Sequence, residues 1–276
     1  MNQTYFTVAS MDVGSAHFAV YVERTPLDEY NSWRTSVRET SQPLIPPLPL
    51  PPGQAQWKAC WNLRSKKLGE RTDGPVTLTT PIPLQPSLPH SSETMDAVLS
   101  KAQVPWEHKH LLWNLQRHRY IWESCQQVLI EKQLNRNPKA IRLEQTALIF
   151  FALCMPGIRV DSYPAKFKTS VLGYPFVGKK YKHHRKVWAV EQASEIVRRR
   201  NDGPFLSWFG LPRIKKDDIA DAILMVQAWK IQQRLLHLGK SSWVSFPLDH
   251  SDEEEAKEEA EEEDDEEEKE EREEKE

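Results

Sequence analysis

Cysteine is scarce in this sequence, with three among 276 residues, at positions 60, 125 and 154. They are odd in number, far apart and form no CxxC pair, which argues against a disulfide framework and indicates a reducing compartment. The histidine pair at residues 183–184 lies far from every cysteine, so the sequence does not predict a zinc site either.

Long hydrophobic runs are also absent. No stretch approaches the roughly 18 apolar residues that a membrane-spanning helix requires. The first residues lack the basic and apolar regions of a secretory signal peptide. We therefore expect a soluble, intracellular protein that is not secreted.

Charge is unevenly distributed, although the formal net charge is only −3. Residues 252–276 contain 19 acidic and 4 basic residues, which leaves 21 acidic and 33 basic residues, a net charge of +12, in residues 1–251. A basic body with an acidic tail is typical of a protein that binds a polyanion. The tail could bind this basic face, bind a basic partner protein, or simply keep the chain in solution.

The order of the predicted elements indicates an α/β protein with a mixed sheet flanked by helices. Alternating or continuous apolar residues predict strands at residues 4–12, 17–23, 56–63, 128–134 and 158–163. Helical periodicity predicts helices at residues 106–127, 139–155, 187–200 and 216–238.

A proline-rich stretch at about residues 40–95 stands apart from this pattern. Its two proline runs, at residues 43–52 and 75–89 on either side of the strand predicted at 56–63, cannot pair in a central sheet. We therefore expect an insertion in polyproline II or loop conformation, either a spacer or a docking segment for a partner. Residues 1–250 are expected to form one domain with this insertion. Residues 251–276 are expected to form a disordered acidic tail.

Four acidic residues occur in apolar surroundings. Asp12 interrupts an apolar strand and Glu131 closes another, whereas Asp218 and Asp221 open a strongly apolar helix. Three of them have an ordinary explanation, whereas Asp221, which an apolar run follows, is harder to dismiss. Asp12 could form an Asx-turn and Glu131 could pair with the lysine that follows it. Asp217 and Asp218 could cap the helix.

Together these carboxylates predict a divalent-metal site. Carboxylates are costly to bury without partners, so a fold that gathers several of them requires cations. Asp218 and Asp221 are three residues apart in a helix and therefore point to one side. Ligation by oxygen alone suits Mg²⁺ better than zinc, and two Mg²⁺ ions could activate water for attack on a phosphodiester.

The sequence around these acids resembles Holliday junction resolvases, in the form found in poxviruses and other large DNA viruses, a branch of the RuvC-like, ribonuclease H-fold nucleases. The resemblance covers about residues 4–23 and 105–235. Its motifs are Asp12-Val13-Gly14, Ile130-Glu131-Lys132-Gln133 and Lys216-Asp217-Asp218-Ile219-Ala220-Asp221-Ala222. It implies a ribonuclease H-like mixed sheet, a homodimer, and paired symmetric nicks in four-way DNA junctions that leave a 5′-phosphate and a 3′-hydroxyl.

The resemblance also implies roles for particular residues. The implied ligands of two Mg²⁺ ions, which Mn²⁺ could replace, are Asp12, Glu131, Asp218 and Asp221. Asp217 is implied as an accessory acid, and the choice between it and Asp218 as ligand stays open. A catalytic basic residue is also implied, for which the best match is Lys186, with Lys180 and Arg185 as alternatives.

The basic segment at residues 178–186 is expected to contact the DNA backbone. The residues in question are Lys179, Lys180, Lys182, Arg185 and Lys186. A nuclear localisation signal and a solvated loop are the alternatives. For the whole chain, the alternatives are another ribonuclease H-fold activity, on RNA–DNA hybrids or in transposase-like strand transfer, and a non-enzymatic DNA-binding protein. The expected location of the protein is a nucleus or a viral replication site, and either would suit each of these functions.

Overall fold

The computed structural model describes residues 4–36, 51–65, 99, 101, 103–133, 137–174, 182–209 and 216–239. Most of the predicted proline-rich insertion, the acidic tail, Lys179 and Lys180 lie outside these residues. The strands are β1 (Tyr5–Val13), β2 (His17–Pro26), β3 (Gln54–Asn62), β4 (Gln127–Lys132) and β5 (Arg159–Pro164). The helices are α1 (Leu27–Thr35), α3 (Trp106–Arg117), α4 (Arg119–Trp122), α5 (Pro138–Cys154), α6 (Ala165–Leu172), α7 (Lys182–Arg199), α8 (Gly203–Phe209) and α9 (Lys216–His237). Of the helices described, none is long and apolar enough to cross a membrane.

The five strands form one sheet in the order β3-β2-β1-β4-β5. Strand β2 is antiparallel to β1 and β3, whereas β4 runs parallel to β1, and β5 runs parallel to β4. This order, with an antiparallel hairpin followed by parallel strands, is that of the ribonuclease H-like fold. The predicted mixed sheet with flanking helices is confirmed.

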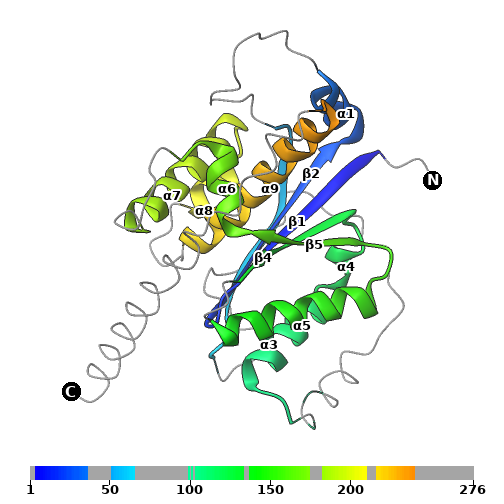
Figure 1. Ribbon diagram of the computed structural model, residues 1–276, viewed down its shortest axis with the longest axis vertical. Coiled ribbons are helices and arrows are strands. Elements are labelled where there is room, and N and C mark those ends of the chain that lie inside the picture. The colour runs from blue at the N-terminus through cyan, green and yellow to red at the C-terminus, as the bar shows by residue number, and fades with distance from the viewer. Residues whose placement is uncertain are drawn as a thin grey trace.

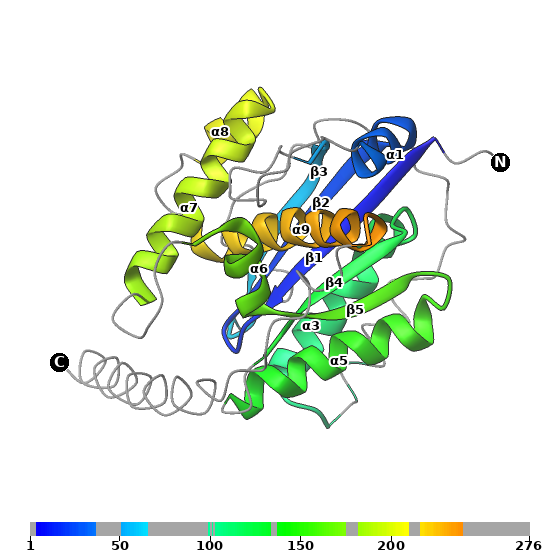
Figure 2. The ribbon, with the colours of Figure 1, turned by 45° about the horizontal axis from the view of Figure 1, so that its top comes forward.

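Helices cover both faces of the sheet (Figures 1 and 2). Helices α3, α4 and α5 lie on one face. Helix α9 crosses the other face, where it also packs against α6 and α7. The result is a three-layer arrangement in which each face of the sheet has its own hydrophobic core.

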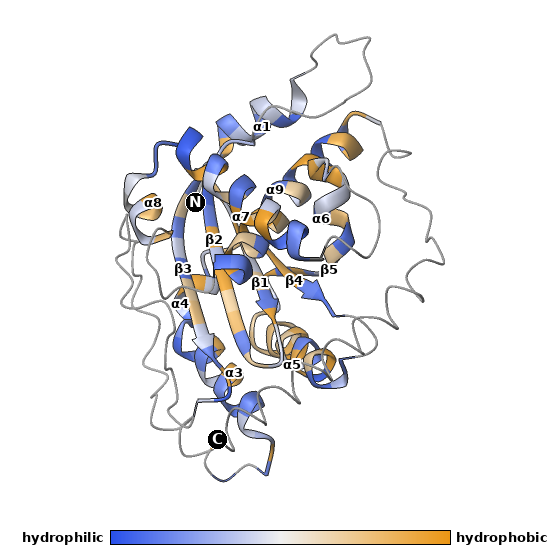
Figure 3. Ribbon diagram, turned by 90° about the vertical axis from the view of Figure 1, so that its left-hand side faces the viewer, coloured by the Kyte–Doolittle hydropathy of each residue, from blue (hydrophilic) through white to orange (hydrophobic). Residues whose placement is uncertain are grey.

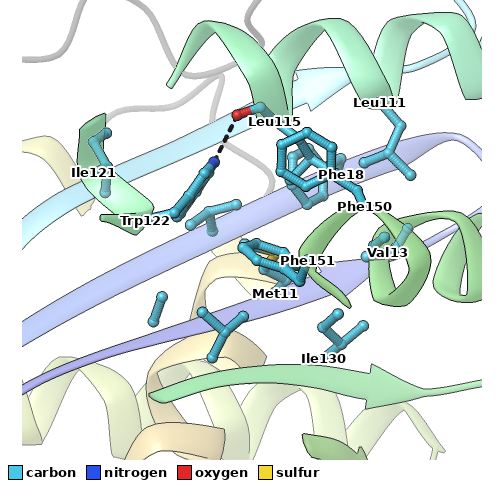
Figure 4. Close-up of a cluster of buried hydrophobic side chains, with 14 of the residues drawn as sticks. Met11, Val13, Phe18, Leu111, Leu115, Ile121, Trp122, Ile130, Phe150 and Phe151 are labelled. Carbon is cyan, nitrogen blue, oxygen red and sulfur yellow. Dashed lines mark hydrogen bonds between the residues drawn. The ribbon is translucent and has the colours of Figure 1, made fainter. Parts of the chain in front are cut away.

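The core beneath α3, α4 and α5 combines large aromatic and aliphatic side chains (Figure 4). Trp122 is fully buried, packs edge-on against Phe151, and donates a 2.7 Å hydrogen bond from Nε1 to the carbonyl oxygen of Leu115. Burying an indole requires such an acceptor for its N–H group. The bond therefore fixes α4 against the end of α3.

Alternation along the central strands decides which side chains face α9. Met11 and Ile130 belong to the core beneath α5, and they lie opposite one another in the parallel pairing of β1 and β4. Successive side chains of a strand point to opposite faces of the sheet. Figure 3 shows the sheet and its helices coloured by the hydropathy of each residue. Asp12 and Glu131, the next residue of each strand, therefore both face α9 at the same end of the sheet.

Several predicted element boundaries were wrong. The predicted helix at residues 106–127 breaks at His118, whose φ of −103° and ψ of 22° are not helical. The basic segment is not simply a loop, because α7 begins at Lys182. Helices α1, α6 and α8 were not predicted, since segments of 9, 8 and 7 residues show too little periodicity.

A buried ion-pair network attaches α9 to β2. Glu23 is fully buried and accepts hydrogen bonds from Arg200, Lys230 and Gln227. Burial alone would raise the pKa of Glu23, but the charges of Arg200 and Lys230 outweigh burial and lower it from 4.5 to about 2. A side chain at Gly53 would clash with the Glu23 carboxylate, so only glycine fits there.

The same cations hold the end of the first proline run within the predicted insertion. Arg200 donates from Nη2 to the carbonyl oxygen of Pro51 at 2.8 Å, and Lys230 donates from Nζ to that of Pro52 at 2.7 Å. Pro51 is buried and Pro52 is half-buried. These two prolines are therefore anchored to the domain and lead directly into β3.

We predict that Glu23→Gln lowers the free energy of unfolding at pH 7 by about 3 kcal/mol, because it leaves two buried cations without their carboxylate. The lowered pKa means that the wild-type contribution is present above pH 4.5 and is lost as the pH falls toward about 2. Urea unfolding should show the difference between the two proteins shrinking over that range. Glu195→Gln is the control, because Glu195 is half-exposed on α7 and pairs with exposed arginines of the same helix. An equal effect of both substitutions would contradict the prediction.

Candidate active site

The structure brings the four predicted carboxylates together at the carboxyl ends of β1 and β4. Asp12 is near the end of β1, Glu131 is the penultimate residue of β4, and Asp218 and Asp221 lie in the first two turns of α9. The charges of the other three carboxylates all act on Asp12. Segments separated by about two hundred residues thus form one acidic centre on the α9 face of the sheet.

Lys168 lies at the middle of this centre, a position that sequence reasoning missed. Its Nζ atom is 2.9 Å from Oε1 of Glu131 and 2.9 Å from Oδ1 of Asp221. The side chain extends from α6, which begins directly after β5, and the residue is only 5% exposed. A buried lysine at this spacing bridges two of the predicted metal ligands.

A sequence signal for Lys168 existed. Within α6, Phe167, Val171 and Leu172 pack against the core on the α9 side. Lys168 is three and four residues before Val171 and Leu172, which places it on the same apolar face of the helix. A lysine on the apolar face of a helix requires a buried acidic partner, and the isolated acids at 131 and 221 were the available ones.

Burial and mutual repulsion dominate the electrostatics of the centre. Burial raises the pKa of Asp12 well above its ordinary value, and the charges of Glu131 and Asp218 raise it further. Burial also raises the pKa of Asp221, against the opposing charge of Lys168. For Lys168, burial would lower the pKa, but the charges of Asp221 and Glu131 outweigh it and raise the pKa above its ordinary value. The centre carries more negative charge than Lys168 can balance.

Two buried polar side chains position the carboxylates. Ser10 is fully buried on β1 and donates from Oγ to the carbonyl oxygen of Ala222 at 2.6 Å, which joins the strand of Asp12 to the turn of α9 that carries Asp221. Glu144, on α5, accepts from the backbone N–H of Gln133 at 2.8 Å. These contacts fix the backbone beside the acids on each side.

Glu144 also reaches β5. Its Oε1 atom accepts a 2.6 Å hydrogen bond from the hydroxyl of Ser162, which lies opposite Ile130 in the β4–β5 pairing. The carboxylate is buried and lies on the α5 face of the sheet, whereas Glu131 faces α9. It therefore holds the end of β4 from behind the acidic centre.

The described part of the basic segment lies beside the acids. Nζ of Lys186 is 3.4 Å from Oδ2 of Asp217, and its side chain is 53% exposed. The charge of Arg185 lowers the pKa of Asp221, against the larger effect of burial. Lys186 and Arg185 thus lie at the exposed rim of the centre, while Lys168 occupies its interior. Asp217 faces that rim and Asp218 faces Asp12, which favours Asp218 as the ligand.

The donor set fits a divalent cation by charge and by chemistry. Its carboxylate oxygens are the ligands that Mg²⁺ and Mn²⁺ prefer, and their repulsion is the kind that a bound cation relieves. Within the described ranges, no group of three His, Cys, Asp or Glu side chains is arranged to hold an ion as it stands. The ammonium group of Lys168 lies between two of the carboxylates that would have to converge.

The fold and the site define a ribonuclease H-like protein with an acidic centre, and similar sequences occur in viruses. No family model matches the chain. It is 33% identical over 120 residues to Uncharacterized protein 97L of Invertebrate iridescent virus 3, and 27% identical over 139 residues to Uncharacterized protein 170L of Invertebrate iridescent virus 6. Each match covers 44% of this chain, which spans about half the length of these curated relatives, 55% and 56% respectively. The matches do not favour the poxvirus form of resolvase.

Two solved structures of a bacterial resolvase show weak similarity. They are the Thermus thermophilus RuvC structure, with a TM-score of 0.33, and T. thermophilus RuvC in complex with Holliday junction substrate, with a TM-score of 0.34. Both are 16% identical and cover 85% of this chain and 98% of their own. Because similarity this low carries no structural argument, the fold assignment rests on the strand order and pairing.

Glu144→Ala should destabilise the protein by about 1 kcal/mol, because it removes a buried carboxylate that accepts hydrogen bonds from the half-buried Gln133 and from the hydroxyl of Ser162. Chemical unfolding of the purified variant measures this. Gln145→Ala, at the exposed neighbouring position of α5, is the matched control and should change stability little. Equal stability of the two variants would show that Glu144 does not hold the end of β4.

Proposed function

We propose that the protein is a metal-dependent endonuclease that resolves four-way DNA junctions. The observation that carries the proposal is the convergence of Asp12, Glu131, Asp218 and Asp221 at one edge of a ribonuclease H-like sheet. Glu131 is buried and the other three are half-buried. Carboxylates gathered in this way repel one another, a costly arrangement from which a protein gains nothing unless cations and a reaction use it. The basic residues beside them match a polyanionic substrate.

The side chains of the centre have distinct parts in this reaction. Bound Mg²⁺ would supply an activated water and stabilise the oxygen that leaves the phosphodiester. Asp12, Glu131, Asp218 and Asp221 would hold it. Lys168 offers a positive charge inside the centre, where the scissile phosphate gains negative charge during attack. The proposed products of hydrolysis are a 5′-phosphate and a 3′-hydroxyl, as the resemblance to resolvases implies.

The start of α7 is the proposed DNA-binding surface. Arg185 and Lys186 are exposed there, and the first turn of α7 contains no acidic residue. Cations at a helix N-terminus are repelled by the positive end of the helix dipole. A bound phosphate would reduce this repulsion. Lys182 starts the same helix, and Lys179 and Lys180 precede it in sequence. We propose that this surface follows the DNA backbone and makes binding salt-sensitive.

The resemblance to resolvases of large DNA viruses and the iridescent virus relatives agree on a viral setting. We therefore propose a role in recombination, repair or processing of a viral genome, at a viral replication site or in the nucleus. The acidic tail is proposed to bind the basic face of the protein or a basic partner protein.

Two other functions make different predictions. Another ribonuclease H-fold activity would favour an RNA–DNA hybrid or a strand-transfer substrate over a junction. A non-enzymatic DNA-binding protein would cleave no substrate with any metal and would bind DNA equally well with Asp12 replaced. Lys168 favours the enzymatic function, because a buried charge pair inside an acidic cluster is an unfavourable way to build a mere docking surface.

Wild-type protein with Mg²⁺ should introduce paired symmetric nicks in a labelled synthetic four-way junction. Asp12→Asn and Asp221→Asn should each reduce the cleavage rate by on the order of 100-fold or more, because each removes a proposed metal ligand. Both variants should still bind the junction in a mobility-shift assay. A linear duplex and an RNA–DNA hybrid, tested beside the junction, measure substrate choice.

Glu123→Gln is the matched control. Glu123 is exposed just beyond α4, where it pairs with half-buried Arg119. It precedes β4, at the end of that strand opposite Glu131. Its loss should leave cleavage unchanged. Junction binding by the wild type without cleavage under any metal would favour the non-enzymatic function, and faster cleavage of the hybrid would favour the ribonuclease.

We further propose that the enzyme acts as a homodimer, since paired nicks in opposite strands require two sites related by symmetry. Helix α5 offers a surface for this contact. Its outer face exposes Ile149 at 58% and Leu153 at 76%, and Ala152 between them is exposed as well. A second copy of the same helix would cover this apolar face in a two-fold arrangement.

Leu153→Glu should convert the dimer to monomer, because it places two like charges in an apolar contact. Sedimentation velocity measures the change in mass. Leu236→Glu, at an exposed leucine of α9, should leave the mass unchanged. A wild-type protein that is monomeric at micromolar concentration, or a Leu153→Glu variant that remains dimeric, would rule out α5 as the dimer contact.

A further inference from the structure

Lys168 occupies the space between two proposed metal ligands. Its ammonium group is 2.9 Å from a carboxylate oxygen of Glu131 on β4 and 2.9 Å from one of Asp221 on α9. These carboxylates come from different elements that have to converge for both to contact one cation. The lysine therefore performs, in this structure, the bridging that a divalent cation would perform.

The position of the lysine differs from that of the other basic residues nearby. Its side chain is 6% exposed, whereas that of Lys186 is 53% exposed and contacts Asp217 at the rim. Charges in water interact weakly, but at an effective dielectric constant near 20 a pair at 4 Å interacts several times more strongly. Lys168 therefore interacts strongly with any charge that enters the centre. Lys186 interacts with such a charge more weakly, because water screens it.

The backbone that carries Lys168 is held in place, whereas its ammonium group stands at the end of a flexible side chain. Helix α6 packs on α9 and follows β5 directly, and Phe167 and Val171 anchor it in the core. The ammonium group is attached through four methylene groups, so it can turn away without any shift of the helix. A change of side-chain rotamer is therefore the simplest route by which one cation replaces another in the centre.

We propose that Lys168 is a built-in counter-ion that divalent cations must displace, so that it stabilises the metal-free protein and weakens metal binding. This deepens the proposed metal-dependent function and rests on it. When metal is absent, the lysine keeps Glu131 and Asp221 together. When metal binds, the ammonium group leaves the two carboxylates and remains close enough to meet a phosphate.

Calorimetric titration with Mn²⁺ and with Mg²⁺, in the absence of DNA, tests the proposal without reference to activity. Lys168→Gln should bind either ion at least tenfold more tightly than the wild type, because no ammonium group has to be displaced. Lys186→Gln is the matched control and should change the affinity less than threefold. Lys168→Arg keeps the charge and should not bind the ions more tightly than the wild type.

Thermal unfolding provides a second measurement. Without metal, Lys168→Gln should melt below the wild type, because four carboxylates then repel one another without an internal cation. Saturating Mg²⁺ should raise the Tm of Lys168→Gln by more than it raises that of the wild type, since tighter binding to the folded state stabilises it more. A variant that folds only when Mg²⁺ is present would also support the proposal.

The outcomes separate this inference from the proposed function. If the wild type binds Mg²⁺ and cleaves junctions but Lys168→Gln binds the ion no more tightly, Lys168 is not a displaceable counter-ion and the nuclease assignment stands. If Lys168→Gln stays unfolded at every Mg²⁺ concentration, the lysine does more than balance charge and the inference fails. If the wild type binds neither ion and cleaves nothing, the proposed function itself is wrong.

Discussion

The repulsion among Asp12, Glu131, Asp218 and Asp221 is the constraint on which the rest of the site depends. Four carboxylates gathered at one edge of a sheet would push their elements apart unless the elements were firmly joined and the charge partly balanced. Parallel pairing of β1 and β4 fixes two of them, and α9 fixes the other two. Lys168 supplies positive charge at the middle.

The long helix α9 is held against the sheet at two levels. Near the acids, its backbone accepts the hydrogen bond from Ser10, and two turns further on Lys230 joins the buried network around Glu23. The first contact sets the distance between the strand and the acidic turn. The contact of Lys230 with Glu23 prevents the helix from tilting, because a tilt would separate the two charges and leave both buried without partners. The orientation of Asp218 and Asp221 is therefore a property of the whole α9 layer.

Acidic and basic surfaces meet at the N-terminal ends of α7 and α9. Arg185 and Lys186 surround the rim of a centre that is itself negative, so a DNA backbone could follow the rim while one phosphate enters the centre. The separation matters because a phosphate and four carboxylates repel one another. In the proposed function, cations inside the centre balance the charge of the carboxylates, and the basic residues around it bind the DNA backbone.

The sequence by itself determined the mixed α/β frame and the four carboxylates, because alternation and helical periodicity are local, and an isolated acid in an apolar run is visible without a structure. It left only a weak signal for Lys168, in the spacing of that lysine with Val171 and Leu172, and none for Glu144. Helix α6 is only 8 residues long, and a lysine there acquires meaning only when β4 and α9 bring Glu131 and Asp221 to either side of it. Glu144 likewise looks like an ordinary helix residue until β4 and β5 supply Gln133 and Ser162. Contacts between residues distant in sequence were decided by the tertiary structure alone, since local propensity carries no information about which charged groups will meet.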